Sequence, residues 1–254
     1  MDALCDPALD ALGGADAILV FTGAGISTGS GIPDFRGPNG LWKRIDPDDF
    51  ALERHLDDPA FRRSTWHRHL RSPFLGAVPN PGHHAVTRLV TSGRALGVVT
   101  QNVDGLHRAA GLEPELLVEI HGDASRVACV SCGAREPIDD VAARWEAGEE
   151  DPACLRCGGI MKPDVVFFGE ALPREATIRA WAMADRADAV LVVGSSLSVY
   201  PAASIPLEIA GRGDPMVVVN RGPTDHDPLA TVHLDGDASD LLPRLVDALV
   251  TTGS

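Results

Sequence analysis

Short apolar runs recur along the chain and predict the strands of a buried β-sheet. Most of these runs are continuous rather than alternating, which is typical of strands that are covered on both faces. The predicted strands are residues 17–22, 95–100, 116–120, 165–168, 189–193 and 216–220.

Segments with a helical spacing of apolar residues separate these runs. The predicted helices are residues 83–91, 174–187, 202–210 and 238–249. Because buried strands alternate with helices, the pattern predicts an α/β fold built on an open, mostly parallel, Rossmann-like sheet.

Two stretches interrupt this alternation. Residues 36–81 are rich in charge, histidine and proline, and we expect them to form a helical excursion. Residues 127–162 contain little apolar periodicity. A segment that cannot build its own core often needs a metal to fold.

Four of the five cysteines lie in the second stretch as two Cys-x-x-Cys pairs. A two-residue gap lets both thiolates of a pair face one ion, and four sulfur ligands complete a closed tetrahedron around zinc. Two disulfides or a redox dithiol are the alternatives. A reducing cytosol disfavours the first, and the matching pairs disfavour the second. We therefore expect one structural zinc ion, with the ligands Cys129, Cys132, Cys154 and Cys157.

These patterns predict two domains. A large Rossmann-like domain would comprise residues 1–36, 82–126 and 163–254. A small domain would combine a helical insertion, residues 37–81, with a zinc ribbon, residues 127–162. The two interruptions are expected to pack together beside the large sheet.

The net charge of the chain limits the classes of partner that we expect it to bind. Its 254 residues include 36 acidic and 22 basic side chains, a formal net charge of −14. Such a surface repels nucleic-acid phosphates and anionic lipid, and mildly favours basic peptides. No apolar run approaches the roughly 18–20 residues of a membrane-spanning helix, and the acidic N-terminal stretch lacks the basic region of a secretory signal. We expect a soluble cytoplasmic protein; its oligomeric state is not readable from the sequence.

A burst of glycines, GAGISTGSGIPDFRG at residues 23–37, follows the first predicted strand. The fingerprint for hydride-transferring dinucleotide domains needs glycine at its sixth place, where Thr28 stands. It also needs an acidic residue about 20 positions later at the end of a strand, and no strand is predicted there. The glycines still allow a pyrophosphate to approach the backbone at a helix N-terminus. Phosphate binding is therefore favoured and redox chemistry is disfavoured.

Further motifs follow in a fixed order. They are TQNVDGLH at residues 100–107, HGD at 121–123, the two cysteine pairs, KPDVVFFGE at 162–170 and GSSLSVYP at 194–201. Together with the glycine burst, these motifs resemble the sirtuins, the NAD-dependent protein deacylases, over nearly the whole chain. KPDVVFFGE and VNRGPTD, at residues 219–225, are most similar to the class II branch.

The resemblance implies that NAD is a substrate: nicotinamide leaves, and the acyl group of an acyl-lysine moves to ADP-ribose. His121 would be the general base, because a neutral imidazole can take a proton from a ribose hydroxyl. Asn102 would lie at the same catalytic centre, where it holds the nicotinamide ribose together with Gln101.

The resemblance also implies the residues that bind the two substrates. Those for NAD are Gly23, Ala24, Gly25, Ser27, Asp34, Phe35, Arg36, Gln101, Asn102, Asp104, Gly194, Ser195, Ser196, Asn220, Arg221, Gly222 and Ala238. Val166 and Phe168 would line the tunnel for the lysine stem of an acyl-lysine peptide, which adds to the protein as an extended strand. His67, His69, His83 and His84 are expected to be surface or packing residues.

Other functions stay open at this point. An ADP-ribosyltransferase would use the same chemistry with a different nucleophile, and a hydride dehydrogenase or a zinc-ribbon interaction module would need different sites. One sirtuin branch holds succinyl groups with a Tyr-x-x-Arg pair, which is absent because the single tyrosine is Tyr200. Residues 61–71 are crowded with Arg and His, and we hypothesise that they accommodate a longer or polar acyl group.

Overall fold

The computed structural model describes residues 5–37 and 40–252; the ends of the predicted domain ranges at residues 1–4 and 253–254, and residues 38–39 of the insertion, lie outside it. Within the described residues, a six-stranded sheet has the order β3-β2-β1-β7-β8-β9, and all neighbouring strands are parallel. Its strands are β1 (Ile18–Thr22), β2 (Ala95–Thr100), β3 (Leu117–Glu119), β7 (Ala189–Val193), β8 (Met216–Asn220) and β9 (Val232–Asp235). The predicted Rossmann-like α/β fold is confirmed.

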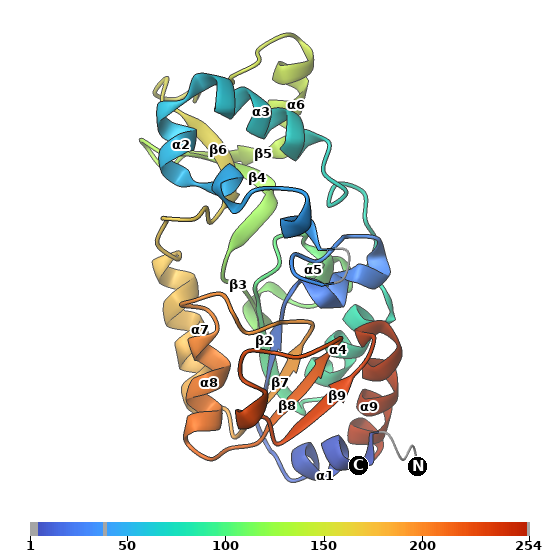
Figure 1. The fold of residues 1–254 in the computed structure, drawn as a ribbon. Coiled ribbons are helices and arrows are strands. Elements are labelled where there is room, and N and C mark those ends of the chain that lie inside the picture. The colour runs from blue at the N-terminus through green and yellow to red at the C-terminus, as the bar shows by residue number, and fades with distance from the viewer. Residues whose placement is uncertain (1–4, 38–39, 253–254) are drawn as a thin grey trace.

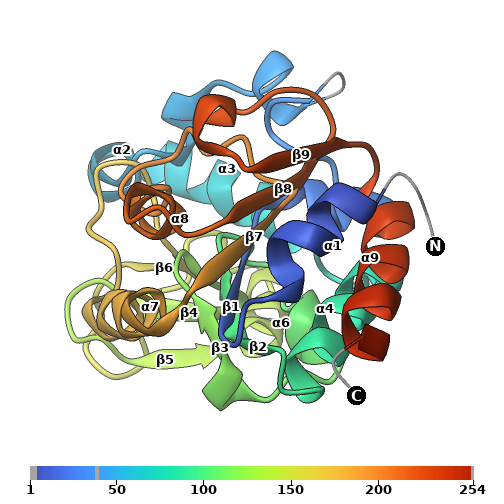
Figure 2. The ribbon, with the colours of Figure 1, turned by 90° about the horizontal axis from the view of Figure 1, so that it is seen from below.

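Helices cover both faces of this sheet (Figure 2). One face packs against α1 (Asp6–Gly13), α4 (Pro81–Thr91) and α9 (Ala238–Thr252), and the other against α7 (Arg174–Arg186) and α8 (Ser204–Gly211). Successive residues of β1 alternate between these two cores: Ile18 and Val20 belong to the first, Leu19 and Phe21 to the second. This period of two, with apolar residues on both sides, explains why the strands appear as continuous apolar runs.

The strand order creates a crevice at the carboxyl edge of the sheet. The chain starts at β1, runs outward through β2 and β3, and returns to the other side of β1 at β7. Ligands of open α/β sheets bind beyond the carboxyl ends of the strands at such a reversal. The loops after β1, β2 and β7 are therefore the segments that matter for function.

A second, antiparallel sheet has the order β5-β4-β6 and lies at the opposite end of the molecule from α1 (Figure 1). Its strands and helices are β4 (Gly122–Cys129), β5 (Arg135–Pro137), β6 (Met161–Val165), α2 (Leu52–Asp57), α3 (Pro59–Leu70) and α6 (Ile138–Glu146). Trp66 of α3 is fully buried in one core with Val127, Val141 and Met161. The insertion and the cysteine-bearing segment thus share a core, and we name these elements the small module.

One predicted strand was misplaced, and the strands β4, β5 and β9 were not predicted. Residues 165–168 were expected to form a strand of the large sheet, but β6 ends at Val165 and pairs with β4 in the small sheet. Beyond it, Phe168 makes only an isolated bridge to Ala51. The run is apolar because it leaves the small module between two packed parts of the molecule. The strand β9 was missed because it is an edge strand, half-exposed and without a continuous apolar run.

Short helical segments complete the chain. They are α5 (Leu106–Ala109) and the 3₁₀ helices η1 (Ala24–Ser30), η2 (Leu41–Lys43), η3 (Pro47–Phe50), η4 (Pro114–Leu116) and η5 (Asp227–Leu229). In the part of the chain that the structure describes, no helix has the length and apolar character that crossing a membrane requires.

Candidate active site

The glycine burst forms a close crossing of two backbone segments at the end of β1. Gly23 N donates to Val193 O at 2.9 Å, and Gly25 N donates to Gly194 O at 2.8 Å. A Cβ on Gly25 would lie 2.6 Å from Gly194 Cα, and one on Gly194, whose φ is +61°, would lie 2.3 Å from Ile26 N. Only glycine permits this contact, so the motif is a structural requirement of the crossing. The helix that follows is the 3₁₀ helix η1 rather than an α-helix.

A pocket of about 280 Å³ opens beside this crossing. Its lining comes from the loop after β1 and from the ends of β7, β8 and β9: Gly25, Thr28, Gly31, Ile32, Pro33, Asp34, Gly194, Val219, Asn220, Arg221, Gly236, Asp237 and Ala238. The structure thus brings together six of the predicted NAD-binding residues, Gly25, Asp34, Gly194, Asn220, Arg221 and Ala238. A cavity of this size at the carboxyl edge, with glycine backbone in its wall, can hold part of a dinucleotide, such as its pyrophosphate.

A buried polar cluster lies next to the crossing. Ser27 Oγ donates to Asp104 Oδ2 at 2.7 Å, and Asn102 Nδ2 donates to Ser27 Oγ at 3.1 Å and to Gly23 O at 3.2 Å. Burial raises the pKa of Asp104, although hydrogen bonds to its carboxylate oppose the shift. Three predicted site residues that are far apart in the sequence therefore form one hydrogen-bonded unit.

His121 lies between the two sheets, directly after β3 and before β4. Its Nδ1 is 3.0 Å from Gln101 O, and because a carbonyl only accepts, the ring proton is on Nδ1 and Nε2 is the free basic nitrogen. Burial lowers the pKa of His121, with the hydrogen bond to Gln101 opposing it. The imidazole is therefore neutral at neutral pH, as a general base must be.

Further hydrogen bonds connect His121 and Gln101 to other predicted substrate residues. Val166 N donates to His121 O at 2.8 Å, and Gln101 Nε2 donates to Ser195 Oγ at 2.8 Å. The segment that carries Val166 and Phe168 is thus fixed against the strand that positions the base, and the loops after β2 and β7 are joined across the crevice.

The remaining predicted residues do not line the 280 Å³ pocket. Phe35 packs against Trp42 with ring centroids 4.9 Å apart, and Arg36 is exposed. Ser196 Oγ is 2.8 Å from Ser198 Oγ, and Gly222 N donates to Asp235 Oδ1. Ala24 begins η1. These residues surround the crevice without converging on one point within it.

Sequence reasoning missed two buried histidines beneath this cluster. His83, which was expected to be a surface or packing residue, is fully buried, and its Nε2 lies 3.4 Å from Oγ of the predicted site residue Ser27. Its ring is 5.1 Å from that of His107. His107 Nε2 lies 2.9 Å from Thr22 Oγ1, which itself donates to Thr100 Oγ1. His107 ends the motif TQNVDGLH and His83 belongs to the capping box of α4, but their burial comes from packing between α4, α5 and the loop after β1, which the sequence does not show.

Acid is expected to destabilise the fold through these two histidines. Burial lowers the pKa of His83 to about 4 and that of His107 to about 3. Below a pH of about 6.5, the unfolded chain binds protons that the folded chain does not, so stability is fully present above this pH and lost as the pH falls. The free energy of unfolding should fall by up to about 1.4 kcal/mol per pH unit for each histidine.

Denaturant unfolding across a series of pH values would measure this slope. His107→Gln is the comparison, since glutamine keeps a donor for Thr22 and does not titrate. The variant should have the shallower dependence of stability on pH. Equal slopes for both proteins would contradict the assignment.

The four paired cysteines converge in the small module. Their Sγ atoms all lie within 4.8 Å of one another; Cys129 and Cys157 are 3.5 Å apart, and Cys132 and Cys154 are 3.7 Å apart. Four ligands at a zinc–sulfur distance of about 2.3 Å would be separated by about 3.8 Å in a tetrahedron. Backbone amides of Cys132 and Ser131 that donate to Cys129 lower the pKa of its thiol, which favours the thiolate that a metal needs. The site fits one structural zinc ion.

Comparisons with known proteins agree with this geometry. A model of the Sir2 family matches residues 23–201. NAD-dependent protein deacetylase 2 of Streptomyces coelicolor is 44% identical over 239 residues, which are 93% of this chain and 99% of the relative. NAD-dependent protein deacylase of Thermococcus kodakarensis is 44% identical over 231 residues, which are 90% of this chain and 89% of the relative.

Solved structures of sirtuins share the fold. A structure described as Sir2 with a p53 peptide and NAD⁺ has a TM-score of 0.85 and 35% identity, and covers 94% of this chain and 95% of its own. Sir2Tm bound to a propionylated peptide has a TM-score of 0.84 and 34% identity, and covers 95% of this chain and 97% of its own. Since the family model matches most of the chain and both relatives align with at least 90% of it, this protein is a member of the Sir2 family, the sirtuins.

Proposed function

We propose that the protein is an NAD-dependent protein-lysine deacylase. Acyl-lysine, NAD and water would give lysine, nicotinamide and O-acyl-ADP-ribose. The relatives named NAD-dependent protein deacetylase and deacylase support this function across most of the chain. The single observation that carries it is the free Nε2 of a neutral His121 beside the crevice, joined by backbone contacts to Gln101 and Val166.

We propose the following roles for the residues around the crevice. His121 takes the proton of a ribose hydroxyl once the acyl oxygen is attached to the sugar. Asn102, held by Ser27 and Gly23, presents its side chain to the nicotinamide ribose, and Asp104 fixes the nicotinamide side. The enclosed site contributes by positioning, which can supply on the order of 7–11 kcal/mol in ideal geometry.

The peptide would bind along the segment after β6. An extended peptide can take main-chain hydrogen bonds from such a segment, while pockets select its side chains. We propose that Val166 and Phe168 border the acyl-lysine there; Phe168 is 46% exposed, which is unusual for a phenylalanine. The solved relatives that hold acetylated or propionylated peptides support a peptide substrate.

The structure does not support the hypothesis that residues 61–71 hold a polar acyl group. Three of their basic side chains are occupied within the molecule: Arg62 pairs with Asp151 at 2.9 Å, Arg68 donates to Asp49 O at 2.7 Å, and His69 Nε2 lies 2.9 Å from Ala124 O. Arg71, in contrast, is exposed. Those three side chains are therefore not free to pair with a carboxylated acyl group. We propose that acetyl and other uncharged acyl groups are preferred.

Incubation with NAD and matched acyl-lysine peptides, read by mass spectrometry, tests both statements. We expect free nicotinamide and O-acetyl-ADP-ribose to appear in equal amounts with deacetylated peptide, and the succinyl peptide to react at least about 10-fold more slowly, since an unpaired buried charge is costly. ADP-ribosylated protein as the main product would favour the transferase alternative, which the relatives' names do not favour. Faster turnover of the succinyl peptide would contradict the acyl preference.

We also propose finer assignments that rest on the sequence motifs. The chain would belong to the class II-like branch, act in the cytoplasm, where thiol ligands stay reduced, and bind no nucleic acid. The predicted division into a large NAD-binding domain and a small domain remains a proposal; β4 and β6 each cross one of its predicted limits.

A further inference from the structure

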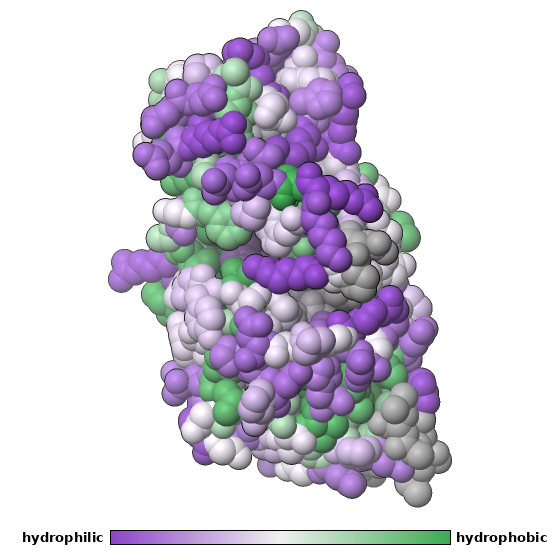
Figure 3. Space-filling view, viewed as in Figure 1, coloured by the Kyte–Doolittle hydropathy of each residue, from purple (hydrophilic) through white to green (hydrophobic). Residues whose placement is uncertain are grey.

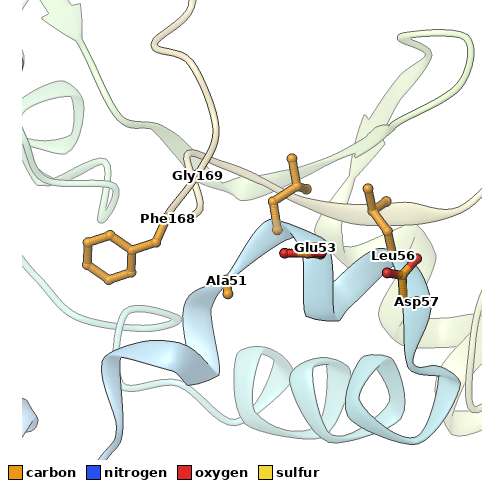
Figure 4. Close-up of a pocket in the computed structure, with 7 residues that line it drawn as sticks. Ala51, Glu53, Leu56, Asp57, Phe168 and Gly169 are labelled. Atoms are coloured by element: carbon orange, nitrogen blue, oxygen red, sulfur yellow. The ribbon is translucent and has the colours of Figure 1, made fainter.

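A groove of about 330 Å³ lies between α2 and the segment that follows β6 (Figure 4). Leu52 and Leu56 supply apolar wall, Glu53 and Asp57 supply two carboxylates, and the backbone of Phe168 and Gly169 closes the other side. Its volume is at the lower end of the range for small-ligand sites, enough for one long side chain. On the same face of the molecule, hydrophilic side chains cover α2 and α3, and an apolar patch lies just below them (Figure 3).

The two carboxylates face the groove from one side of α2. Glu53, Leu56 and Asp57 are three and four residues apart, a spacing that places side chains on one helix face. No ion pair or hydrogen bond involves either carboxylate among residues 5–37 and 40–252. Like charges at this spacing repel each other, and Asp57 is the last residue of α2, where the helix dipole also disfavours an anion.

Nearby cations do not neutralise this charge. Arg54 pairs with Asp49 at 3.2 Å and lies over the ring of Phe61. Lys162 is buried and pairs with Glu170 at 3.0 Å. The groove therefore combines apolar walls with an uncompensated negative charge, the combination that a long cationic side chain fits.

The groove is continuous with the proposed peptide-binding segment. Leu52 N donates to Phe168 O at 3.0 Å, and Phe168 N donates to Phe50 O at 2.8 Å. The ring of Phe168 turns away from the carboxylates toward Trp42, 6.0 Å between centroids, so its backbone rather than its ring borders the groove (Figure 4). An extended peptide advances about 3.3 Å per residue, so a side chain near the acyl-lysine can reach the groove.

We propose that this groove is a subsite for an arginine or lysine side chain that flanks the acyl-lysine of the substrate. The apolar walls would cover the stem of that side chain, and Glu53 and Asp57 would pair with its charged end. The inference rests on the proposed deacylase function and adds a substrate class to it, namely acyl-lysine sites in basic sequences.

A peptide scan tests the subsite. Acetyl-lysine peptides in an alanine background would carry one arginine, or one glutamate, at each of about three positions on either side of the acetyl-lysine. At one of these positions we expect arginine to raise kcat/KM about three- to tenfold over alanine, mainly through KM, because two exposed charge pairs contribute modestly. The preference should weaken as salt is added.

Variants of Glu53 and Asp57 test whether the preference for arginine peptides arises in this groove. In Glu53→Gln/Asp57→Asn, the ratio of kcat/KM for arginine to alanine peptides should fall to about one, and Glu53→Lys/Asp57→Lys should prefer the glutamate peptide. The matched control is Glu175→Gln/Asp185→Asn, which removes the same charge from exposed positions of α7 and should keep the ratio. A wild-type protein without arginine preference at any position, or a preference that survives Glu53→Gln/Asp57→Asn, would overturn the proposal.

Calorimetric binding of the same acetyl-lysine peptides without NAD separates this inference from the proposed function. Tighter binding of the arginine peptide, lost in Glu53→Gln/Asp57→Asn, supports the subsite whether or not the peptide is turned over. Turnover of all peptides with equal affinity rejects the subsite and leaves the deacylase function intact.

Discussion

His121→Ala is expected to lower turnover by at least about 100-fold, because general-base catalysis contributes roughly 10²–10⁴-fold. Nicotinamide release from NAD and acetyl-lysine peptide, followed by mass spectrometry, would measure the loss. Zinc content and the melting temperature should stay near those of the unmodified protein. Among the residues that the structure describes, the His121 side chain has one hydrogen bond, to Gln101 O, so its loss should leave the other hydrogen bonds of the site in place.

The pH dependence of kcat/KM gives the same residue a second test. Burial lowers the pKa of His121 below its ordinary value of 6.5, so the basic form persists on the acid side of neutrality. The rate should stay level through neutral pH and fall only below about pH 6.5, where the imidazole becomes protonated.

A neighbouring carboxyl group must be separated from this profile. Burial raises the pKa of Glu119 to about 7, with Arg108 opposing the shift, so Glu119 titrates in the same range. Glu119→Gln is therefore the matched control. In this variant, kcat/KM should still fall below about pH 6.5, a fall that we call the acid limb of the profile. Full activity of His121→Ala, or an acid limb that vanishes with Glu119→Gln, would contradict the assignment of the base.

Cys154→Ala is expected to release the zinc ion and unfold the small module. Structural zinc contributes an apparent binding free energy of about 10–16 kcal/mol in small zinc-binding peptides, more than the whole stability of a typical domain. Cys154 also lies in the core of this module with Trp66, so metal loss and core disruption coincide. Zinc per chain, tryptophan fluorescence and far-ultraviolet circular dichroism would follow the change.

Activity should be lost with the metal, because β6 leads from the small module into the proposed peptide-binding segment. Cys5→Ala is the control: this cysteine lies in front of α1, far from the pairs, and the variant should keep one zinc ion. A strong chelator should reproduce the effect of Cys154→Ala. A Cys154→Ala protein that stays folded and active would show that the cysteine pairs have no structural metal role.

The sequence predicted strands that are buried on both faces more accurately than strands with exposed positions. The strands β7 and β8 were predicted at their observed limits. Each is buried on both faces and therefore appears in the sequence as a nearly continuous apolar run. The edge strand β9 and the strands β4 and β5 carry mixed residues, since each has exposed positions. Residues 165–168 were misassigned because an apolar linker between two packed parts has the same composition as a strand.

In the candidate site, too, the features that local motifs mark were predicted, and those that depend on contacts between distant segments were not. The glycine burst, His121 and the cysteine pairs were visible as motifs, because each is marked by residues close together in the chain. The crossing of the glycine burst with Gly194 was not visible in this way. The unit of Ser27, Asn102 and Asp104 was named residue by residue, but its hydrogen bonds join loops more than 70 positions apart. The burial of His83 and His107 could not be read from the sequence, although His107 is the last residue of the motif TQNVDGLH.

The sequence by itself predicted most of the large sheet, the four cysteines that cluster and a candidate for the base, because hydrophobic burial and ligand spacing act over a few residues. Only the tertiary structure decided which nitrogen of His121 is free, which histidines stay neutral, and that Glu53 and Asp57 border the proposed peptide-binding segment. Those properties depend on desolvation and on contacts between distant segments, and both exist only once the chain has folded.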